Sequence, residues 1–224
     1  MSCRVVVLLS GRGSNLDALL RTVHVPEDIP VEIVGVISNR PGARGLELAR
    51  AAGVTSATLD HRRYPDREAF EAVLATTIDA LAPDLLVLAG FMRVLSPAFV
   101  GRYSPNMLNI HPSLLPEFRG LDTHARVLAR NDPVHGASVH VVVPEIDAGP
   151  VVAQVAVPVH ADDTPATLAE RVQQGEHLLY PRVLKCYAAG RIELSETEVR
   201  LDGQALPTTG VRFHLDRAGN RLEP

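Results

Sequence analysis

An amide and an imidazole stand together where the sequence predicts the end of a buried strand. The stretch Met107-Leu108-Asn109-Ile110-His111 is mostly apolar, and Pro112 ends it. Residues two apart in a strand point to the same side, so Asn109 and His111 present their side chains together. In open α/β sheets, ligands bind outside the carboxyl ends of the strands. The pair is therefore a candidate catalytic or binding site, and the alternative is a pair of core residues with satisfied hydrogen bonds.

A carboxylate in the second half of the chain can complete this site. Asp147 lies shortly before Gly149-Pro150, between two β-branched segments, and an Asp in such a place is usually a turn former. If it meets His111, it favours the imidazolium and orients the ring, which creates a proton donor near neutral pH. The sequence has no Gly-x-Ser-x-Gly elbow and no cysteine in the setting of an activated thiolate. We therefore expect direct attack of one substrate on another, with the protein stabilising an oxyanion.

A glycine-rich turn follows the first predicted strand. In Ser10-Gly11-Arg12-Gly13-Ser14-Asn15, bare backbone N–H groups and a helix N-terminus can hold a phosphate, or the turn is an ordinary one capped by Ser14 or Asn15. Leu16 occupies the place of the third glycine of a dinucleotide fingerprint, and no Gly-Lys-Ser/Thr of a Walker loop follows.

Composition narrows the class of protein. The 224 residues are 46% hydrophobic and 21% charged, which suits one substantial core or two small ones. The longest apolar stretches, 5–9 and 85–89, are far shorter than the roughly 20 residues that span a bilayer, and no signal peptide is indicated. The net charge of -4 does not suit a nucleic-acid binder, and the two cysteines, Cys3 and Cys186, form no metal or disulfide pattern. We expect a cytoplasmic protein with neither nucleic acid nor membrane as a partner.

Apolar runs alternate with amphipathic segments, which predicts an α/β fold with an open, mostly parallel twisted sheet and helices on both faces. Predicted strands are 5–9, 31–37, 56–59, 85–89 and 107–110, and predicted helices are 15–23, 46–52, 67–81 and one from Ser96-Pro97. The helix over 67–81 is expected to bury Phe70, Val73, Leu74, Ile78 and Leu81.

The second half predicts a mixed, antiparallel extension of the sheet. Segments 138–143 and 151–159 are joined by only seven residues, too few for a helical crossover. A long helix should begin at Thr164-Pro165, and short strands at 192–194 and 199–201 should follow. We expect a single domain over 1–224, with an N-terminal half of about 1–105, a C-terminal half of about 106–207 and a polar tail over 208–224 that is loosely ordered from about Arg217.

Four ordered motifs resemble one enzyme family. They are Ser10 to Asn15, Leu88-Ala89-Gly90-Phe91-Met92-Arg93-Val94-Leu95, Leu108-Asn109-Ile110-His111-Pro112-Ser113-Leu114-Leu115-Pro116 and Glu145-Ile146-Asp147-Ala148-Gly149-Pro150. From residue 5 to about 207, the sequence resembles the glycinamide ribonucleotide formyltransferases, which use 10-formyltetrahydrofolate. Methionyl-tRNA formyltransferase and formyltetrahydrofolate deformylase share the last two motifs and remain the alternative. The extra C-terminal RNA-binding domain of the first and N-terminal regulatory domain of the second are not expected here.

The resemblance implies a Rossmann-like formyltransferase fold and the transfer of a formyl group from 10-formyltetrahydrofolate to the amine of glycinamide ribonucleotide, in de novo purine biosynthesis. The implied catalytic residues are Asn109, His111 and Asp147. The implied ribonucleotide-binding residues are Gly13, Ser14, Asn15, Gln173, Gln174, Gly175 and Glu176. The implied folate-binding residues are Arg67, Met92, Arg93, Val94, Leu95, Asn109, Val143, Pro144, Glu145, Ile146 and Asp147. No metal is implied, and the protein is expected to be a monomer or homodimer.

Some positions depart from the family pattern. Arg12 replaces a small or amide residue, and Glu117-Phe118-Arg119 and Asp122 alter a segment that often carries a basic residue and a histidine. We assign the acidic positions no role. His140, on an apolar strand, is interpreted as structural rather than catalytic.

Overall fold

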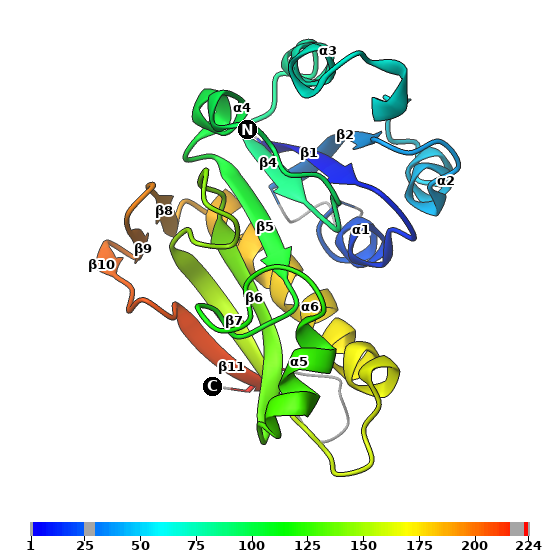
Figure 1. Cartoon of the computed structure of the whole chain (residues 1–224). Helices are drawn as coiled ribbons and strands as arrows, with labels where there is room; N and C mark the ends of the chain where they lie inside the picture. Colours follow the sequence, from blue (N-terminus) through cyan, green and yellow to red (C-terminus); the bar gives the residue numbers. More distant parts are fainter. Residues whose placement is uncertain (1, 25–29, 216–221, 224) are drawn as a thin grey trace. The chain divides into compact units, whose positions relative to one another are not determined.

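The computed structural model describes residues 2–24, 30–215 and 222–223 (Figure 1). The chain forms two compact units, Met1–Asn109 and Ile110–Pro224. The division falls close to the predicted change of character near residue 105, but inside a strand rather than in a linker. Each unit has its own secondary structure and core.

The first unit is a doubly wound parallel sheet. Its strand order is β5-β4-β1-β2-β3, and every neighbouring pair is parallel. The strands are β1 (Cys3–Leu9), β2 (Val31–Ser38), β3 (Ser56–Thr58), β4 (Leu85–Leu88) and β5 (Met107–His111), whose last two residues belong to the second unit. Figure 1 shows α1 (Ser14–Leu19) and α2 (Arg44–Ala51) on one side of this sheet, and α3 (Arg67–Asp79) and α4 (Pro97–Tyr103) on the other. The five strands and the cover of both faces confirm the predicted fold class.

Local sequence explains where these helices begin. The side chains of Asp66 and Ser96 accept hydrogen bonds from the third residue of α3 and of α4, and Pro97 occupies the first turn of α4 as predicted. Two expectations were wrong. Val73 is 38% exposed, because the buried stripe of α3 repeats every four residues through Phe70, Leu74 and Ile78 and leaves Val73 at its flank. The helix expected over 15–23 changes at Leu20 into a π-helical turn, Leu20–His24.

The second unit is a mixed sheet with one long helix. Its strands β6 (Val134–Val141) and β7 (Val151–Pro158) are antiparallel, which confirms the predicted extension, although β6 begins four residues earlier than expected. Helix α6 (Pro165–Ala188) packs against both strands and begins with a capping box between Thr164 and Thr167. A small sheet contains the predicted β8 (Ile192–Leu194) and β9 (Val199–Leu201) together with β10 (Gln204–Ala205). Helix α5 (Thr123–Arg130) was not predicted.

The expected polar tail over 208–224 contains a strand. β11 (Val211–Leu215) pairs in parallel with β7, and β12 (Leu222–Glu223) pairs with β11. Val211, Phe213 and Leu215 alternate with two polar residues, and a run this short was overlooked as a strand signal. The loose order expected from about Arg217 falls mainly on residues 216–221 and 224, which lie outside the described residues.

Both cysteines are half-buried free thiols, Cys3 on β1 and Cys186 on α6. Burial, aided by the negative charge of Asp84, raises the pKa of Cys3 to about 11. Among the described residues, no helix is both long enough and apolar enough to cross a membrane.

Candidate active site

The second unit brings His111 and Asp147 together, as the sequence suggested. His111 ends β5 and is 5% exposed, and its Nδ1 lies 3.3 Å from Oδ2 of Asp147. Its Nε2 donates a hydrogen bond of 3.0 Å to the carbonyl oxygen of Phe118. Both ring nitrogens therefore face acceptors. Asn109 precedes His111 by two residues on β5, in the first unit, and is half-buried.

Asp147 is fixed from two further directions. The backbone N–H of Gly120 donates to Oδ2 at 2.9 Å, and Nε2 of the buried His140 lies 3.6 Å from Oδ1. Asp147 itself has a φ of 50°, which a tight turn imposes. His140, interpreted from the sequence as structural, thus faces the carboxylate, while its Nδ1 contacts its neighbour's carbonyl at 2.9 Å.

Burial and hydrogen bonding act in opposite directions on these two groups. Burial raises the pKa of Asp147, but the contact with His140, the charge of His111 and the Gly120 N–H together bring its pKa below the ordinary value. Burial lowers the pKa of His111, and the acceptors Phe118 and Asp147 oppose this shift without overcoming it. The pair therefore consists of a stable carboxylate beside an imidazole that gives up its proton easily, which is an arrangement suited to proton transfer.

The loop of residues 117–122 holds this pair, a role that the sequence does not predict. Its backbone supplies both the Phe118 carbonyl and the Gly120 N–H. Phe118, Gly120 and Asp122 all have positive φ, at 53°, 81° and 56°. Gly120 was the available signal, because only glycine adopts this conformation freely.

The loop predicted to bind phosphate lies in the first unit. Gly13 has a φ of 76° at the N-cap of α1, and a Cβ placed there would lie 2.6 Å from the Cα of Gly45. Only glycine fits at this position. Ser14 and Asn15 follow as the first residues of α1.

The same unit contains the segment predicted to bind folate. Ser10 ties the two loops together, because its N–H donates to the Gly90 carbonyl at 3.0 Å and its hydroxyl accepts from the Met92 N–H at 2.8 Å. Arg93 stacks over the Phe70 ring at 5.1 Å. Leu95 is buried, and Arg67, at the start of α3, is exposed and lies 4.0 Å from Glu68.

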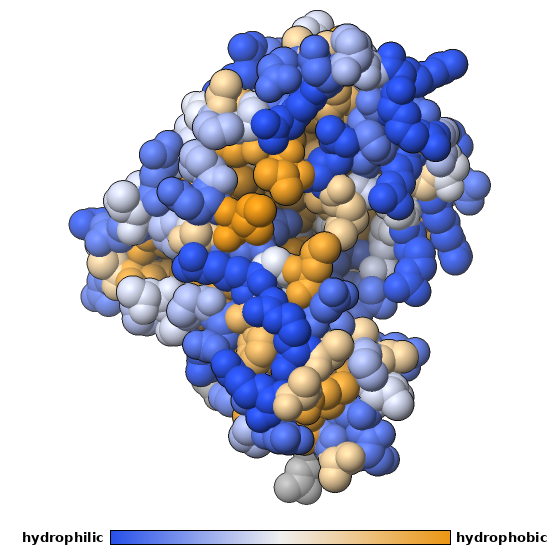
Figure 2. Space-filling model, viewed as in Figure 1, coloured by the Kyte–Doolittle hydropathy of each residue, from blue (hydrophilic) through white to orange (hydrophobic). Residues whose placement is uncertain are grey.

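Exposed apolar side chains mark the predicted folate segments. Figure 2 shows apolar residues reaching the surface among hydrophilic ones. Among the described residues, three of the six large apolar side chains that are exposed are Met92, Val94 and Ile146, at 57%, 54% and 54%. Val143 is half-buried, and Pro144 and Glu145 are exposed. Apolar groups at the surface of these segments fit an aromatic ligand.

The residues predicted on α6 have different surroundings. Glu176 is buried, Gln173 is half-buried and Gln174 is exposed. A Cβ at Gly175 would lie 2.8 Å from Cγ1 of Val155, so close packing of α6 on β7 explains this glycine by itself.

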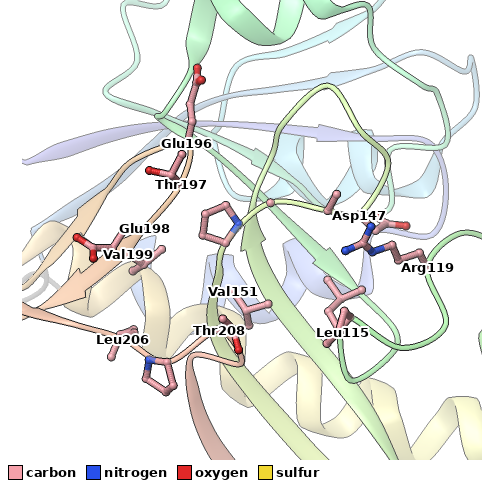
Figure 3. Close-up of a pocket in the computed structure, with 15 residues that line it drawn as sticks. Leu115, Arg119, Asp147, Val151, Glu196, Thr197, Glu198, Val199, Leu206 and Thr208 are labelled. Atoms are coloured by element: carbon pink, nitrogen blue, oxygen red, sulfur yellow. The ribbon is translucent and has the colours of Figure 1, made fainter.

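A pocket of about 600 Å³ opens beside Asp147 in the second unit (Figure 3). Leu115, Arg119 and Val151 line it together with residues 196–199 and 206–208. No motif of the sequence points to these residues as a site.

Comparisons with known proteins identify the family. The sequence profile of the family described as formyl transferase matches residues 3–184. The phosphoribosylglycinamide formyltransferase of Escherichia coli strain K12 is 48% identical over 206 residues, which cover 92% of this chain and 97% of the relative. The trifunctional purine biosynthetic protein adenosine-3 of Bos taurus is 43% identical over 193 residues, or 86% of this chain and 19% of its own length.

Solved structures agree. The phosphoribosylglycinamide formyltransferase of Coxiella burnetii has a TM-score of 0.89 at 45% identity, covering 95% of this chain and 99% of the other. A glycinamide ribonucleotide transformylase of Symbiobacterium toebii has a TM-score of 0.84 at 41% identity, covering 89% and 94%. The resemblance seen in the four motifs is therefore confirmed, and the chain belongs to the formyl transferase family.

Proposed function

We propose that this enzyme transfers the formyl group of 10-formyltetrahydrofolate to the amine of glycinamide ribonucleotide, in the cytoplasm, as a step of purine biosynthesis. The observation that carries the proposal is the His111–Asp147 pair, held at the end of β5 by Phe118 and Gly120. The names of the similar proteins support the choice of acceptor.

The proposed chemistry is proton transfer and oxyanion stabilisation by the chain's own groups. The folate, when bound, supplies the formyl carbon that the amine attacks. Asn109 and protonated His111 stabilise the charge that develops on the formyl oxygen. In the structure, Nε2 of His111 donates to the neutral Phe118 carbonyl, and an oxyanion, as a stronger acceptor, competes for that N–H. Asp147 keeps the ring oriented and, through a water, passes the amine proton to the departing folate nitrogen.

The binding residues are proposed with the roles that the resemblance implies. Gly13, Ser14 and Asn15 hold the ribonucleotide phosphate, and Gln173, Gln174, Gly175 and Glu176 contact the ribonucleotide. Arg67, residues 92–95 and residues 143–147 bind the folate, and the exposed side chains of Met92, Val94 and Ile146 support this assignment. The reaction needs no metal, and the protein acts as a monomer or homodimer.

The choice of acceptor is tested by following tetrahydrofolate release with three candidate acceptors. Glycinamide ribonucleotide, methionyl-tRNA and water alone are each supplied with 10-formyltetrahydrofolate. Release is expected with the ribonucleotide only. Equal release with water alone would indicate a deformylase, and transfer to the tRNA would indicate the tRNA enzyme, so either result would overturn the proposal.

The role of His111 is tested by His111→Ala. Loss of one oxyanion donor typically costs roughly 100- to 1,000-fold in turnover, and ribonucleotide binding is expected to survive. His214→Ala is the matched control, because this exposed histidine of β11 belongs to the same unit. Turnover of His111→Ala close to that of the control would remove His111 from the mechanism.

A further inference from the structure

Two of the contacts that fix His111 and Asp147 come from the backbone of the 117–122 loop. The Phe118 carbonyl accepts from His111, and the Gly120 N–H donates to Asp147. Two non-glycine residues of the loop, Phe118 and Asp122, have φ values of 53° and 56°, a conformation that side chains disfavour. The loop therefore needs contacts from elsewhere to keep its shape.

One side chain, Arg126 on α5, contacts three residues of the loop. Its Nη1 donates to the Arg119 carbonyl at 2.7 Å and to the Leu121 carbonyl at 3.2 Å. Its guanidinium carbon lies 5.3 Å from the centroid of the Phe118 ring. The two carbonyls lie on either side of Gly120, so this one guanidinium restrains the peptide that contacts Asp147 and packs on the residue whose carbonyl contacts His111.

A second arginine of α5 contacts only side chains of the loop. Arg130 stacks over Phe118 at 4.1 Å and pairs with Glu117 at 2.6 Å, and it also pairs with Asp132. Within the part of the chain that the structure describes, its guanidinium donates to the carboxylates of Glu117 and Asp132 and to no backbone group of the loop. Of these two arginines, Arg126 is therefore the one that hydrogen-bonds to the loop's backbone.

We propose that Arg126 is a positioning residue for formyl transfer. Its hydrogen bonds fix the carbonyls on either side of Gly120, so that the loop holds His111 and Asp147 in position for the reaction. The inference rests on the proposed role of this pair in the reaction. The inference also gives a role to the 117–122 loop, a segment in which the sequence departs from the family pattern.

The charge of Arg126 also reaches His111. The charged and titratable groups that act on or face this imidazole are Asp147 after β6, His135 and His140 on β6, and His124 and Arg126 on α5. Burial is the largest cause of the lowered pKa of His111, and the charges of His140 and Arg126 add to it. Removing the charge of Arg126 should therefore raise the pKa of His111.

Two variants separate position from charge. Arg126→Gln removes the guanidinium and its charge, whereas Arg126→Lys keeps the charge but has no planar group to stack on the Phe118 ring while it donates to the two carbonyls. We expect kcat to fall about tenfold in both, because misplacement of a catalytic pair is costly, with the KM for both substrates within about twofold of the original protein. The high-pH limb of the kcat profile should move to higher pH in Arg126→Gln and stay in place in Arg126→Lys.

Arg191→Gln is the matched control, because Arg191 is an exposed arginine of the same unit whose guanidinium pairs with Asp202, away from the 117–122 loop. The thermal unfolding midpoint of each variant is measured alongside. Unchanged kcat in Arg126→Gln would overturn the inference, as would a loss that disappears once the fraction of unfolded protein is corrected for. If Arg126→Gln does not fold, unchanged kcat in a folded Arg126→Lys overturns it. Absence of ribonucleotide formylation by the original protein would instead contradict the proposed function.

Discussion

Two histidines, one of which packs edge-on against Phe118, share one hydrogen bond. His135 on β6 is 1% exposed, and its Nε2 lies 3.1 Å from Nδ1 of His124 on α5. One ring donates and the other accepts, so the ring that accepts is neutral. Burial, aided by the charge of His124, lowers the pKa of His135 to about 4. Burial also lowers the pKa of His124.

This pair predicts a loss of stability in mild acid. Between pH 6.5 and pH 4, the unfolded chain binds a proton at residue 135 that the folded chain does not, so the free energy of unfolding falls as the pH falls. His135 alone accounts for about 3 kcal/mol over this range. Urea unfolding of His135→Gln at several pH values should show a slope shallower by about 1.4 kcal/mol per pH unit. An unchanged slope, or the same change in the exposed His214→Gln, would contradict this.

The sequence allowed the meeting of His111 and Asp147 to be anticipated, because strand alternation and a strand-joining turn placed both at strand ends. Their catalytic role stays a prediction. Phe118 and Gly120 could not be assigned the same way, because they act through backbone groups, which side-chain type does not reveal. The contacts of Arg126 depend on left-handed loop residues that follow no periodic pattern.

Strand β11 is hydrogen-bonded to a buried amide side chain of the second unit. Gln154 of β7 is fully buried, and its Nε2 donates to the Leu115 carbonyl at 2.8 Å and to the Ser138 hydroxyl at 2.9 Å. Arg212 of β11 donates to its Oε1 at 2.7 Å. Strand β11, which was not predicted, therefore supplies a hydrogen-bond donor to the buried side-chain oxygen of Gln154.

Removing this donor should destabilise the protein. Arg212→Met leaves the Gln154 oxygen without the arginine, and an unsatisfied buried acceptor costs about 1–3 kcal/mol. Urea unfolding of Arg212→Met, Gln154→Met and the double variant gives the coupling between the two sites. Arg200→Met, which removes an exposed pair with Glu198, is the control and should change stability by less than about 1 kcal/mol. Additive effects of the two substitutions would show that the contact does not stabilise β11.

Most of the strands and helices could be predicted, including the short strands β3, β8 and β9, but α5 and β11 could not. Five apolar runs indicated the parallel strands, and Thr164-Pro165 indicated the start of α6. Helix α5 has only Thr123 and Val127 buried among its eight residues. Its sequence therefore lacks the apolar stripe by which an amphipathic helix is predicted.

At the scale of the whole molecule, the boundary between the units falls within β5. Met107, Leu108 and Ile110 of this strand are at most 6% exposed, unlike the exposed linker that usually separates independent domains. The family profile ends at residue 184, yet β8, β9 and β11 continue the second unit beyond it.

A strand shared by both units predicts cooperative unfolding. Melting of either unit frees one end of β5, so the stability of the other should fall with it. Scanning calorimetry is expected to show a single transition whose calorimetric and van't Hoff enthalpies agree. Two separated transitions would show that the units unfold independently.

The burial of the Cys3 thiol has a practical consequence for handling the protein. The thiolate is the form that alkylating reagents and oxidants attack, so Cys3, with a pKa of about 11, stays almost wholly protonated at pH 8. Slow air oxidation and slow maleimide labelling follow at this position for as long as β1 keeps its place. The rate at which Cys3 reacts with a maleimide should therefore report on opening of the sheet in the first unit, because the thiol becomes more reactive when β1 leaves its place.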